Sequence, residues 1–190
     1  LVALAAVTGG ATGRLHLGDH ARFAPARRAA GPPAGPVRHV SVVVARPPTD
    51  GEGPDPVAVL GPGALAAAEQ LAGATVAALT VHRPAAGRAV VDLRLTDGGT
   101  GSLDLAFDDA AVWQAQVASD DEVVTVELAP LPVAERNGDP LPVDPGPPTR
   151  DRRLVDLGYL DQLRVLADVH ADAAPAHVED VRRLRLLETD

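Results

Sequence analysis

The chain has 190 residues, of which 46% are apolar and only 2% aromatic, and its formal net charge at pH 7 is −9. It contains no Cys, Met or Lys, which excludes disulfides, cysteine-bound zinc or iron–sulfur sites, a lysine Schiff base and a P-loop lysine. The acidic charge repels nucleic-acid phosphates, so we expect no nucleic acid among its partners. The length is sufficient for one domain with a buried core.

The N-terminal segment Leu1–Val7 is apolar and is followed by the glycine-rich turn Thr8–Gly13. We expect a first buried strand here. The alternative is the end of a signal or anchor segment, although this run is too short to cross a bilayer, which needs about 20 residues. We therefore predict a cytoplasmic protein, or an exported one if Leu1–Val7 ends such a segment. Membrane attachment is expected only with an N-terminal anchor.

Two regions rich in Pro and Gly follow, Phe23–Pro36 and Pro47–Pro56. Both are interpreted as loops, because proline removes a backbone donor and fixes φ. Between them, Val37–Ala45 is predicted to be a strand, in which Val40, Val42 and Val44 share one face.

A helix is predicted over Pro62–Leu71, because Pro stands at its start and Gly73 just past its end. The preceding residues Val57–Leu60 are predicted to form a short strand. Four later segments alternate with period two, which is typical of strands with one buried face. They are Thr75–His82, Gly87–Thr96, Ser102–Phe107 and Glu122–Leu128.

Short polar or glycine-rich turns separate the first three of these strands, so we expect them to be antiparallel neighbours. Asp108–Ala118, between the third and fourth, favours a short helix with an aspartate N-cap. The alternative is a strand, because Val112 and Gln114 also alternate.

The C-terminal third begins with seven prolines between Pro130 and Pro148, which predicts a linker or extended arm. Arg150–His170 carries a broad leucine stripe typical of an amphipathic helix. His177–Leu187 suits a second helix or a closing strand. We therefore divide the chain into a sheet-rich core with one or two short helices (1–129), a proline-rich linker (130–149) and a helical segment packed on the core (150–190), all within one domain.

Together these elements predict an α+β fold with a mostly antiparallel sheet of five to seven strands and two or three helices packed on one face. The alternative is a three-layer α/β fold that starts with a nucleotide-binding βα turn.

The turn Thr8–Gly13 resembles the start of short-chain dehydrogenases, where such a turn cradles a pyrophosphate at a helix N-terminus. The resemblance is confined to the first residues of the chain and implies NAD(P) binding through Gly9, Gly10 and Gly13. Leu15 stands where the last glycine of that pattern is expected, and the Tyr-x-x-x-Lys pair of the family cannot form without Lys. A plain hairpin turn is the simpler interpretation.

A second resemblance lies in Gly13–His20, which is similar to the HIGH-type signature of class I aminoacyl-tRNA synthetases. Asp19 interrupts the signature, and the lysine-rich second motif of that family is absent. We interpret His16 and His20 as strand and loop residues.

A metal site is a further candidate. His170, Asp172, His177 and Asp180 supply four nitrogen and oxygen ligands close together in the sequence, a set that could hold Zn²⁺ or Mn²⁺. Pro175 separates the two halves. The simpler interpretation is that these residues end one helix and begin the next, where acidic side chains favour the positive helix end.

Acidic residues near the predicted strand ends are candidates for acid–base catalysis if a cleft holds two of them together. The candidates are Asp104 with Asp108, and Asp120 and Asp121 with Glu122. The simpler interpretation is that they are solvated turn residues.

None of these motifs is complete, so we predict a non-enzymatic structural or protein-interaction module without a cofactor. We expect it to be a subunit of an oligomer, with a protein partner or a second copy of itself. The alternative is a small enzyme that binds a nucleotide through Gly9–Gly13 or a divalent metal through His170–Asp180.

Overall fold

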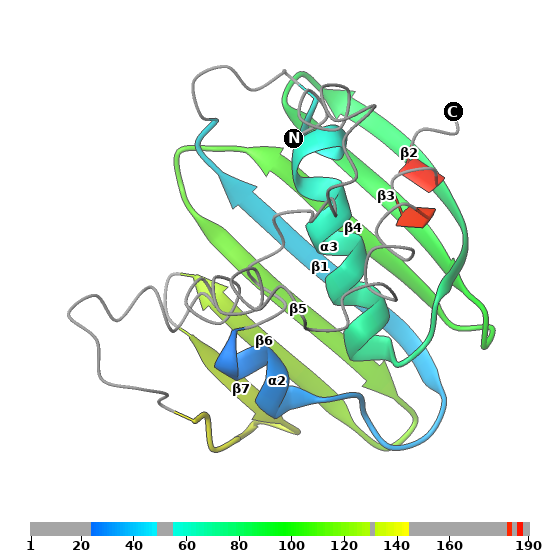
Figure 1. Cartoon of the computed structure of the whole chain (residues 1–190), viewed down its shortest axis with the longest axis vertical. Coiled ribbons are helices and arrows are strands. Elements are labelled where there is room, and N and C mark those ends of the chain that lie inside the picture. Colours follow the sequence, from blue (N-terminus) through cyan, green and yellow to red (C-terminus); the bar gives the residue numbers. More distant parts are fainter. Residues whose placement is uncertain (1–23, 49–54, 130–131, 145–181, 184–185, 188–190) are drawn as a thin grey trace, which may run out of the picture.

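The computed structural model describes residues 24–48, 55–129, 132–144, 182–183 and 186–187. Its centre is one eight-stranded mixed sheet, and two helices lie on one face of this sheet (Figure 1). The elements are α2 (Pro25–Ala30), β1 (Val37–Arg46), α3 (Pro56–Ala72), β2 (Val76–Ala85), β3 (Arg88–Leu95), β4 (Thr100–Phe107), β5 (Val112–Ser119), β6 (Val123–Ala129), β7 (Val133–Arg136) and β8 (Asp139–Pro140).

The strand order is β2-β3-β4-β1-β5-β6-β7-β8. β1 and β4 are parallel, and the other neighbours are antiparallel. The prediction of a mostly antiparallel sheet of five to seven strands is therefore wrong: the sheet has eight strands and is mixed. Alternation in the sequence identifies the two faces of a strand but not its lateral neighbours, and β1 is inserted between β4 and β5.

The helix α3 confirms the helix predicted over Pro62–Leu71 but begins earlier, at Pro56. Its N-cap is Asp55, whose side chain accepts a hydrogen bond from the Val57 N–H at 3.0 Å. Gly73 ends the helix in the left-handed conformation, with φ 66°, which glycine adopts without steric cost. The short strand predicted over Val57–Leu60 is wrong, because these residues form the first turn of α3.

Two other local predictions are also wrong. The region Phe23–Pro36, predicted to be a loop, contains α2, because Pro25 stands at a helix start, where its missing N–H costs nothing. Residues 112–118, for which a helix was favoured, lie in β5. Ala115 and Val117 are buried and Gln116 between them is exposed, so the alternative interpretation as a strand is correct.

Within the proline-rich stretch, β7 and β8 form a hairpin that adds to the sheet. Asn137 and Gly138 connect them, with φ values of 54° and 84°, as a two-residue turn between antiparallel strands requires. Pro140 lies in the edge strand β8, where the absent N–H removes no ladder bond. Most of the predicted helices Arg150–His170 and His177–Leu187 lies outside the described residues.

The core lies between the sheet and the helices. α3 contacts β1, β3, β4 and β5, and α2 contacts β6 and β7. The buried strand residues are mostly Val and Leu, and α3 is rich in buried Ala. Most of α3 is buried all round, as expected for a helix without a polar face. No helix among the described residues is long and apolar enough to span a membrane.

Candidate functional site at the carboxyl ends of β1 and β4

The parallel strands β1 and β4 end side by side, with Arg46 opposite Phe107. The Asp108 N–H donates to the Arg46 carbonyl at 3.1 Å. This hydrogen bond links the C-terminal ends of the two strands. From here the chain continues to α3 after β1, and to β5 on the other side of β1 after β4. In sheets with parallel strands and helical crossovers, ligands bind outside the carboxyl ends where such connections diverge. We therefore take this end, the β1–β4 carboxyl end (Arg46, Phe107, Asp108 and Trp113), as the candidate site.

An aromatic ring and a buried cation meet beside these strand ends. Trp113 is the single tryptophan of the chain and lies in β5, opposite Val44. The guanidinium carbon of Arg27, in α2, lies 5.8 Å from the centroid of the Trp113 ring, within the range of a cation–π interaction. Only 1% of Arg27 is exposed. The pair therefore brings a positive charge and a large π-face to the candidate site.

The N-terminus of α3 lies at the same end of the sheet. Asp55 forms an ion pair with Arg83, near the end of β2, with an N–O distance of 3.3 Å. β2 runs in the same direction as β1, because it is antiparallel to β3, which is antiparallel to β4. Both side chains are exposed, so the pair adds little stability. It links the residue before α3 to the end of β2.

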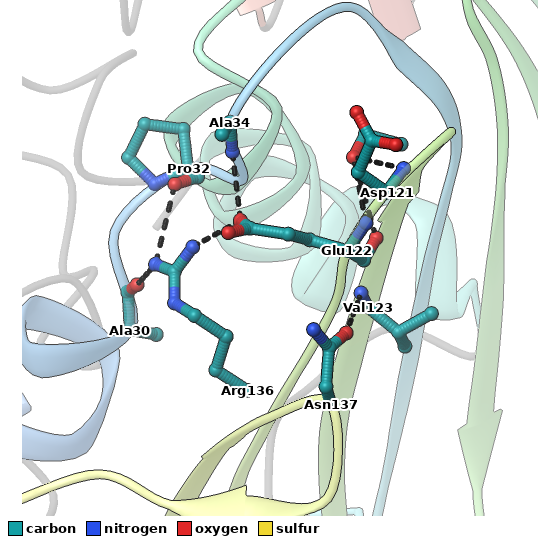
Figure 2. A network of polar contacts seen from close by, with 9 residues as sticks. Ala30, Pro32, Ala34, Asp121, Glu122, Val123, Arg136 and Asn137 are labelled. Carbon is teal, nitrogen blue, oxygen red and sulfur yellow. Dashed lines mark hydrogen bonds and ion pairs between the residues drawn. The ribbon is translucent and has the colours of Figure 1, made fainter.

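A carboxylate–arginine network holds α2, the helix that carries Arg27, against the sheet. Figure 2 shows Glu122 and Arg136 pointing toward each other beside the segment from Ala30 to Ala34. Glu122 Oε2 accepts the Ala34 N–H at 2.8 Å and pairs with Arg136. Arg136 Nη2 donates to the Ala30 carbonyl at 2.9 Å. We call this network the Glu122 clasp.

The Glu122 clasp favours the ionised carboxylate. The hydrogen bond from the Ala34 N–H holds the pKa of Glu122 below its usual value, and the charge of Arg136 lowers this pKa further, against an opposing effect of burial. Beside it, the Val123 N–H donates to Asn137 Oδ1 at 2.8 Å, as Figure 2 also shows. The start of β6 is thus bound both to the β7–β8 turn and to the segment that follows α2.

The other face of the sheet is polar and contacts none of the described helices. One residue from each of seven strands forms a continuous polar row across it: Thr80, Asp92, Ser102, Ser41, Gln116, Thr125 and Glu135. Beside this row His82 Nε2 lies 3.0 Å from Asp92 Oδ2. An imidazole oriented by a carboxylate can transfer protons. Both side chains are more than half exposed, so we regard this pair as part of a solvated surface.

The acidic residues singled out in the sequence are engaged in structural contacts. Asp104 accepts from Arg88 at 2.7 Å, Asp108 from the Ala110 N–H at 3.3 Å, Asp120 from Arg38 at 2.6 Å, and Glu122 takes part in its clasp. Asp121 lies exposed in the turn between β5 and β6, where its N–H donates to Ser119. The arginine partners come from other strands, which the local sequence does not reveal.

The remaining candidates lie outside the described residues. These are the turn residues Gly9, Gly10 and Gly13, the histidines His16 and His20, and the metal set His170, Asp172, His177 and Asp180. Within the described part of the chain, no group of three His, Cys, Asp or Glu residues is placed to hold a metal ion.

Sequence reasoning missed the Arg27–Trp113 pair because the segment around Arg27 was interpreted as a loop. Two signals could have indicated it. Pro25 is followed by residues without helix breakers, as at a helix start, and Trp113 is a rare large aromatic in a chain whose core is built from Val, Leu and Ala.

No protein-family model matches the sequence, and no curated protein sequence matches it. Several solved structures have the same fold. GenD2 from gentamicin A biosynthesis, in complex with NAD, matches 90% of this chain at 20% identity with a TM-score of 0.64. UDP-N-acetylglucosamine 3-dehydrogenase GnnA from Acidithiobacillus ferrooxidans matches 97% at 16% identity with a TM-score of 0.62. Aldose-aldose oxidoreductase from Caulobacter crescentus, complexed with glycerol, matches 98% at 18% identity with a TM-score of 0.57.

The likeness is one of fold, and it is partial. The chain spans 58% of the length of GenD2 and 64% of the other two structures. The predicted structural or protein-interaction module, acting as an oligomer subunit, is nevertheless a wrong prediction, because the structures that share this fold include a dehydrogenase and an oxidoreductase. The alternative of an enzyme agrees better with this finding. The error arose because incomplete motifs were taken as evidence against catalysis.

Proposed function

We propose that this chain is the sheet-bearing part of an NAD(P)-linked oxidoreductase of the Gfo/Idh/MocA type. The observation that carries the proposal is the match of 90–98% of the chain to oxidoreductase structures, two of which contain NAD or NAD⁺. Because the identity is low and a fold does not specify a reaction, the activity rests on analogy of fold together with the candidate site.

The proposed substrate class is a small polyhydroxylated compound, such as a sugar, a cyclitol or a hydroxy acid. Structures that share the fold include a UDP-N-acetylglucosamine 3-dehydrogenase, a "putative myo-inositol dehydrogenase" from Sinorhizobium meliloti, and an oxidoreductase from Agrobacterium radiobacter in complex with NAD⁺, L-tartaric acid and magnesium. In the proposed reaction a carbinol carbon gives a hydride to the nicotinamide, and its hydroxyl gives a proton to a base or water. The products are a carbonyl compound and the reduced cofactor.

We propose that this substrate binds at the β1–β4 carboxyl end. The site contains an aromatic ring, Trp113, and lies next to a buried cation, Arg27, and to Asp55 at the start of α3. Such a combination of an aromatic group and a few polar groups is typical of small-molecule sites. Binding of the nucleotide through Gly9, Gly10 and Gly13 stays a prediction. A cytoplasmic location is part of this proposal, since that compartment supplies NAD(P).

The test combines a binding readout with an activity readout on the full chain. Trp113 is the only tryptophan, so its fluorescence reports on this site alone. We expect titration with NAD⁺, NADP⁺, myo-inositol, glucose and L-tartrate to change this fluorescence for at least one cofactor and one polyol. The same cofactor and polyol, incubated together with the protein, should then form the reduced cofactor, which is measured by its absorbance at 340 nm.

Two variants localise the binding. Arg27→Met, which retains the side-chain volume without the charge, should weaken polyol binding, while Ser102→Ala on the opposite face should leave it unchanged. If no cofactor and no polyol changed the fluorescence, and no reduced cofactor formed with any pair, the proposed function would be wrong.

A further inference from the structure

The Arg27–Trp113 pair depends on the placement of a very short helix. Arg27 lies in the six-residue helix α2, and its guanidinium carbon is 5.8 Å from the centroid of the Trp113 ring. α2 packs over β6 and β7, whereas Trp113 lies in β5, the strand next to β6. The Arg27 side chain therefore extends sideways from its helix to reach the ring. A small shift of α2 changes this contact directly.

Apolar packing alone does little to fix α2. A helix of six residues is far shorter than the helices that are stable by themselves in water, so tertiary contacts set its position. Its buried apolar residues are Pro25, Ala26 and Ala30, and such small side chains bury little apolar area. Among the described residues, no side chain caps its N-terminus at Ala24. Polar contacts must therefore supply much of the restraint.

The Glu122 clasp supplies such contacts at the C-terminal end of α2. The last four carbonyls of a helix lack intrahelical partners, and Arg136 Nη2 donates to one of them, the Ala30 carbonyl, at 2.9 Å. The same guanidinium pairs with Glu122, whose carboxylate accepts the Ala34 N–H at 2.8 Å (Figure 2). Arg27 lies about 4.5 Å from Ala30 along the helix axis, at 1.5 Å per residue. The clasp thus acts within one turn of Arg27.

From these contacts we infer that Arg136 is a positioning residue of the candidate site: its hydrogen bond to the end of α2 holds the Arg27 guanidinium over the Trp113 ring. Glu122 acts one step earlier, because it orients the Arg136 guanidinium. Charge-assisted hydrogen bonds of this kind are strong, and the planar guanidinium makes them directional. That the Arg27–Trp113 pair binds substrate rests on the proposed function, whereas its positioning by Arg136 does not.

Fluorescence of Trp113, the only tryptophan, tests this positioning on the full chain without any ligand. Arg27→Met removes the charge beside the ring and defines the change in emission that accompanies loss of the contact. We expect Arg136→Gln to change the emission in the same direction, and to add no further change when Arg27→Met is already present. General loosening of the fold would instead change the emission in both backgrounds.

A second variant keeps the test valid if Arg136→Gln is too unstable. Arg136→Lys keeps a positive charge beside Glu122, but a single ammonium lacks the fixed fork of donors that reaches both Glu122 and the Ala30 carbonyl. It should change the emission as Arg136→Gln does. Arg38→Gln is the matched control, because Arg38 pairs with Asp120, in the turn that precedes Glu122, at 2.6 Å. It should leave the emission as in the wild type.

The fluorescence comparison can overturn the inference in three ways. Arg27→Met could leave the emission unchanged, Arg136→Gln and Arg136→Lys could both do so, or Arg136→Gln could change it equally with and without Arg27→Met. Any of these results would show that Arg136 does not act through the pair.

Kinetics separate this inference from the proposed function. With the cofactor and polyol found in the test of that function, Arg136→Gln should lower kcat/KM about 10- to 100-fold, because a displacement of about 1 Å in a positioning group has effects of this size. Arg38→Gln should not lower it. A changed emission with an unchanged kcat/KM would overturn the assignment of Arg136 to the candidate site. If the wild type binds no cofactor or polyol, the proposed function fails, and the fluorescence comparison still decides whether Arg136 positions Arg27.

Discussion

Glu122, the residue before β6, accepts the backbone N–H of Ala34 at 2.8 Å, although the two are 88 positions apart in the sequence. The bond closes the segment after α2 onto the sheet, and Arg136 completes the clasp from β7 (Figure 2). Glu69, a buried carboxylate in α3 that pairs with Arg182 and Arg183, has the same arrangement. It accepts the Val76 N–H, and Arg182 links it to the Val76 carbonyl. Twice, therefore, a segment distant in sequence is held by charge-assisted hydrogen bonds.

The Glu122 clasp predicts a pH dependence of stability. The folded protein lowers the pKa of Glu122, chiefly through the Ala34 N–H and also through Arg136. A carboxyl whose pKa is lower in the folded than in the unfolded state stabilises the fold above its unfolded pKa, about 4.3. That contribution is lost as the pH falls through the folded pKa. The free energy of unfolding of the wild type should therefore exceed that of Glu122→Gln at pH 6, and the difference should shrink toward pH 3.

Urea unfolding at several pH values measures this difference. Arg136→Gln is the matched variant: it removes the charge partner but keeps the Ala34 N–H, so part of the pH dependence should remain. If the free energies of unfolding of the wild type and Glu122→Gln differed by the same amount from pH 6 to pH 3, the lowered pKa of Glu122 would be contradicted.

The ion pairs between Glu69 and its two arginines predict a large loss of stability when only one partner is truncated. Glu69→Ala leaves Arg182 and Arg183 beside a buried space without their carboxylate, and such a change costs about 3–5 kcal/mol. Replacing all three residues by apolar ones should recover a large part of this loss, because no buried charge then lacks compensation. Chemical denaturation of the single and triple variants distinguishes the two outcomes. Equal stability of both would show that the charge balance is unimportant.

The N-cap of α3 gives a prediction with an internal control. Asp55→Ala removes the acceptor for the Val57 N–H and should cost about 1 kcal/mol. Asp55→Asn retains a good capping side chain but loses the charge that pairs with Arg83, and should cost less than about 0.5 kcal/mol. Thermal and urea unfolding measure both. A loss in Asp55→Asn as large as in Asp55→Ala would mean that the ion pair outweighs the cap.

The contact between the parallel strands leaves no room at Gly101. A Cβ there would lie 2.6 Å from the Val40 carbonyl oxygen and 2.6 Å from Val40 Cγ1. Because backbone atoms cannot move aside without disturbing the β1–β4 ladder, Gly101→Ala should destabilise the fold by about 1–3 kcal/mol or more. Ser102→Ala, on the opposite face of the same strand, should change the stability by less than about 0.5 kcal/mol. Comparable effects of the two substitutions on urea unfolding would contradict this packing.

The sequence by itself determined the local properties of the chain. Residues two apart along a strand share a face, so the alternation around Val91 and Leu103 predicted strands and their buried sides. The helix α3 followed from Pro and Gly at its ends. The hairpin at Asn137–Gly138 also had a local signal, although the surrounding prolines led to its interpretation as a linker.

Tertiary structure decided which segments meet. The insertion of β1 between β4 and β5, the pairing of Glu69 with arginines more than 100 residues later, and the approach of Arg27 to Trp113 have no counterpart in local spacing. Lateral strand order and charge pairing are set when the whole apolar surface is buried at once, and many arrangements satisfy the same local pattern. The order of the sheet and the composition of the candidate site were therefore consequences of long-range packing, whereas the faces of the strands followed from residues next to one another.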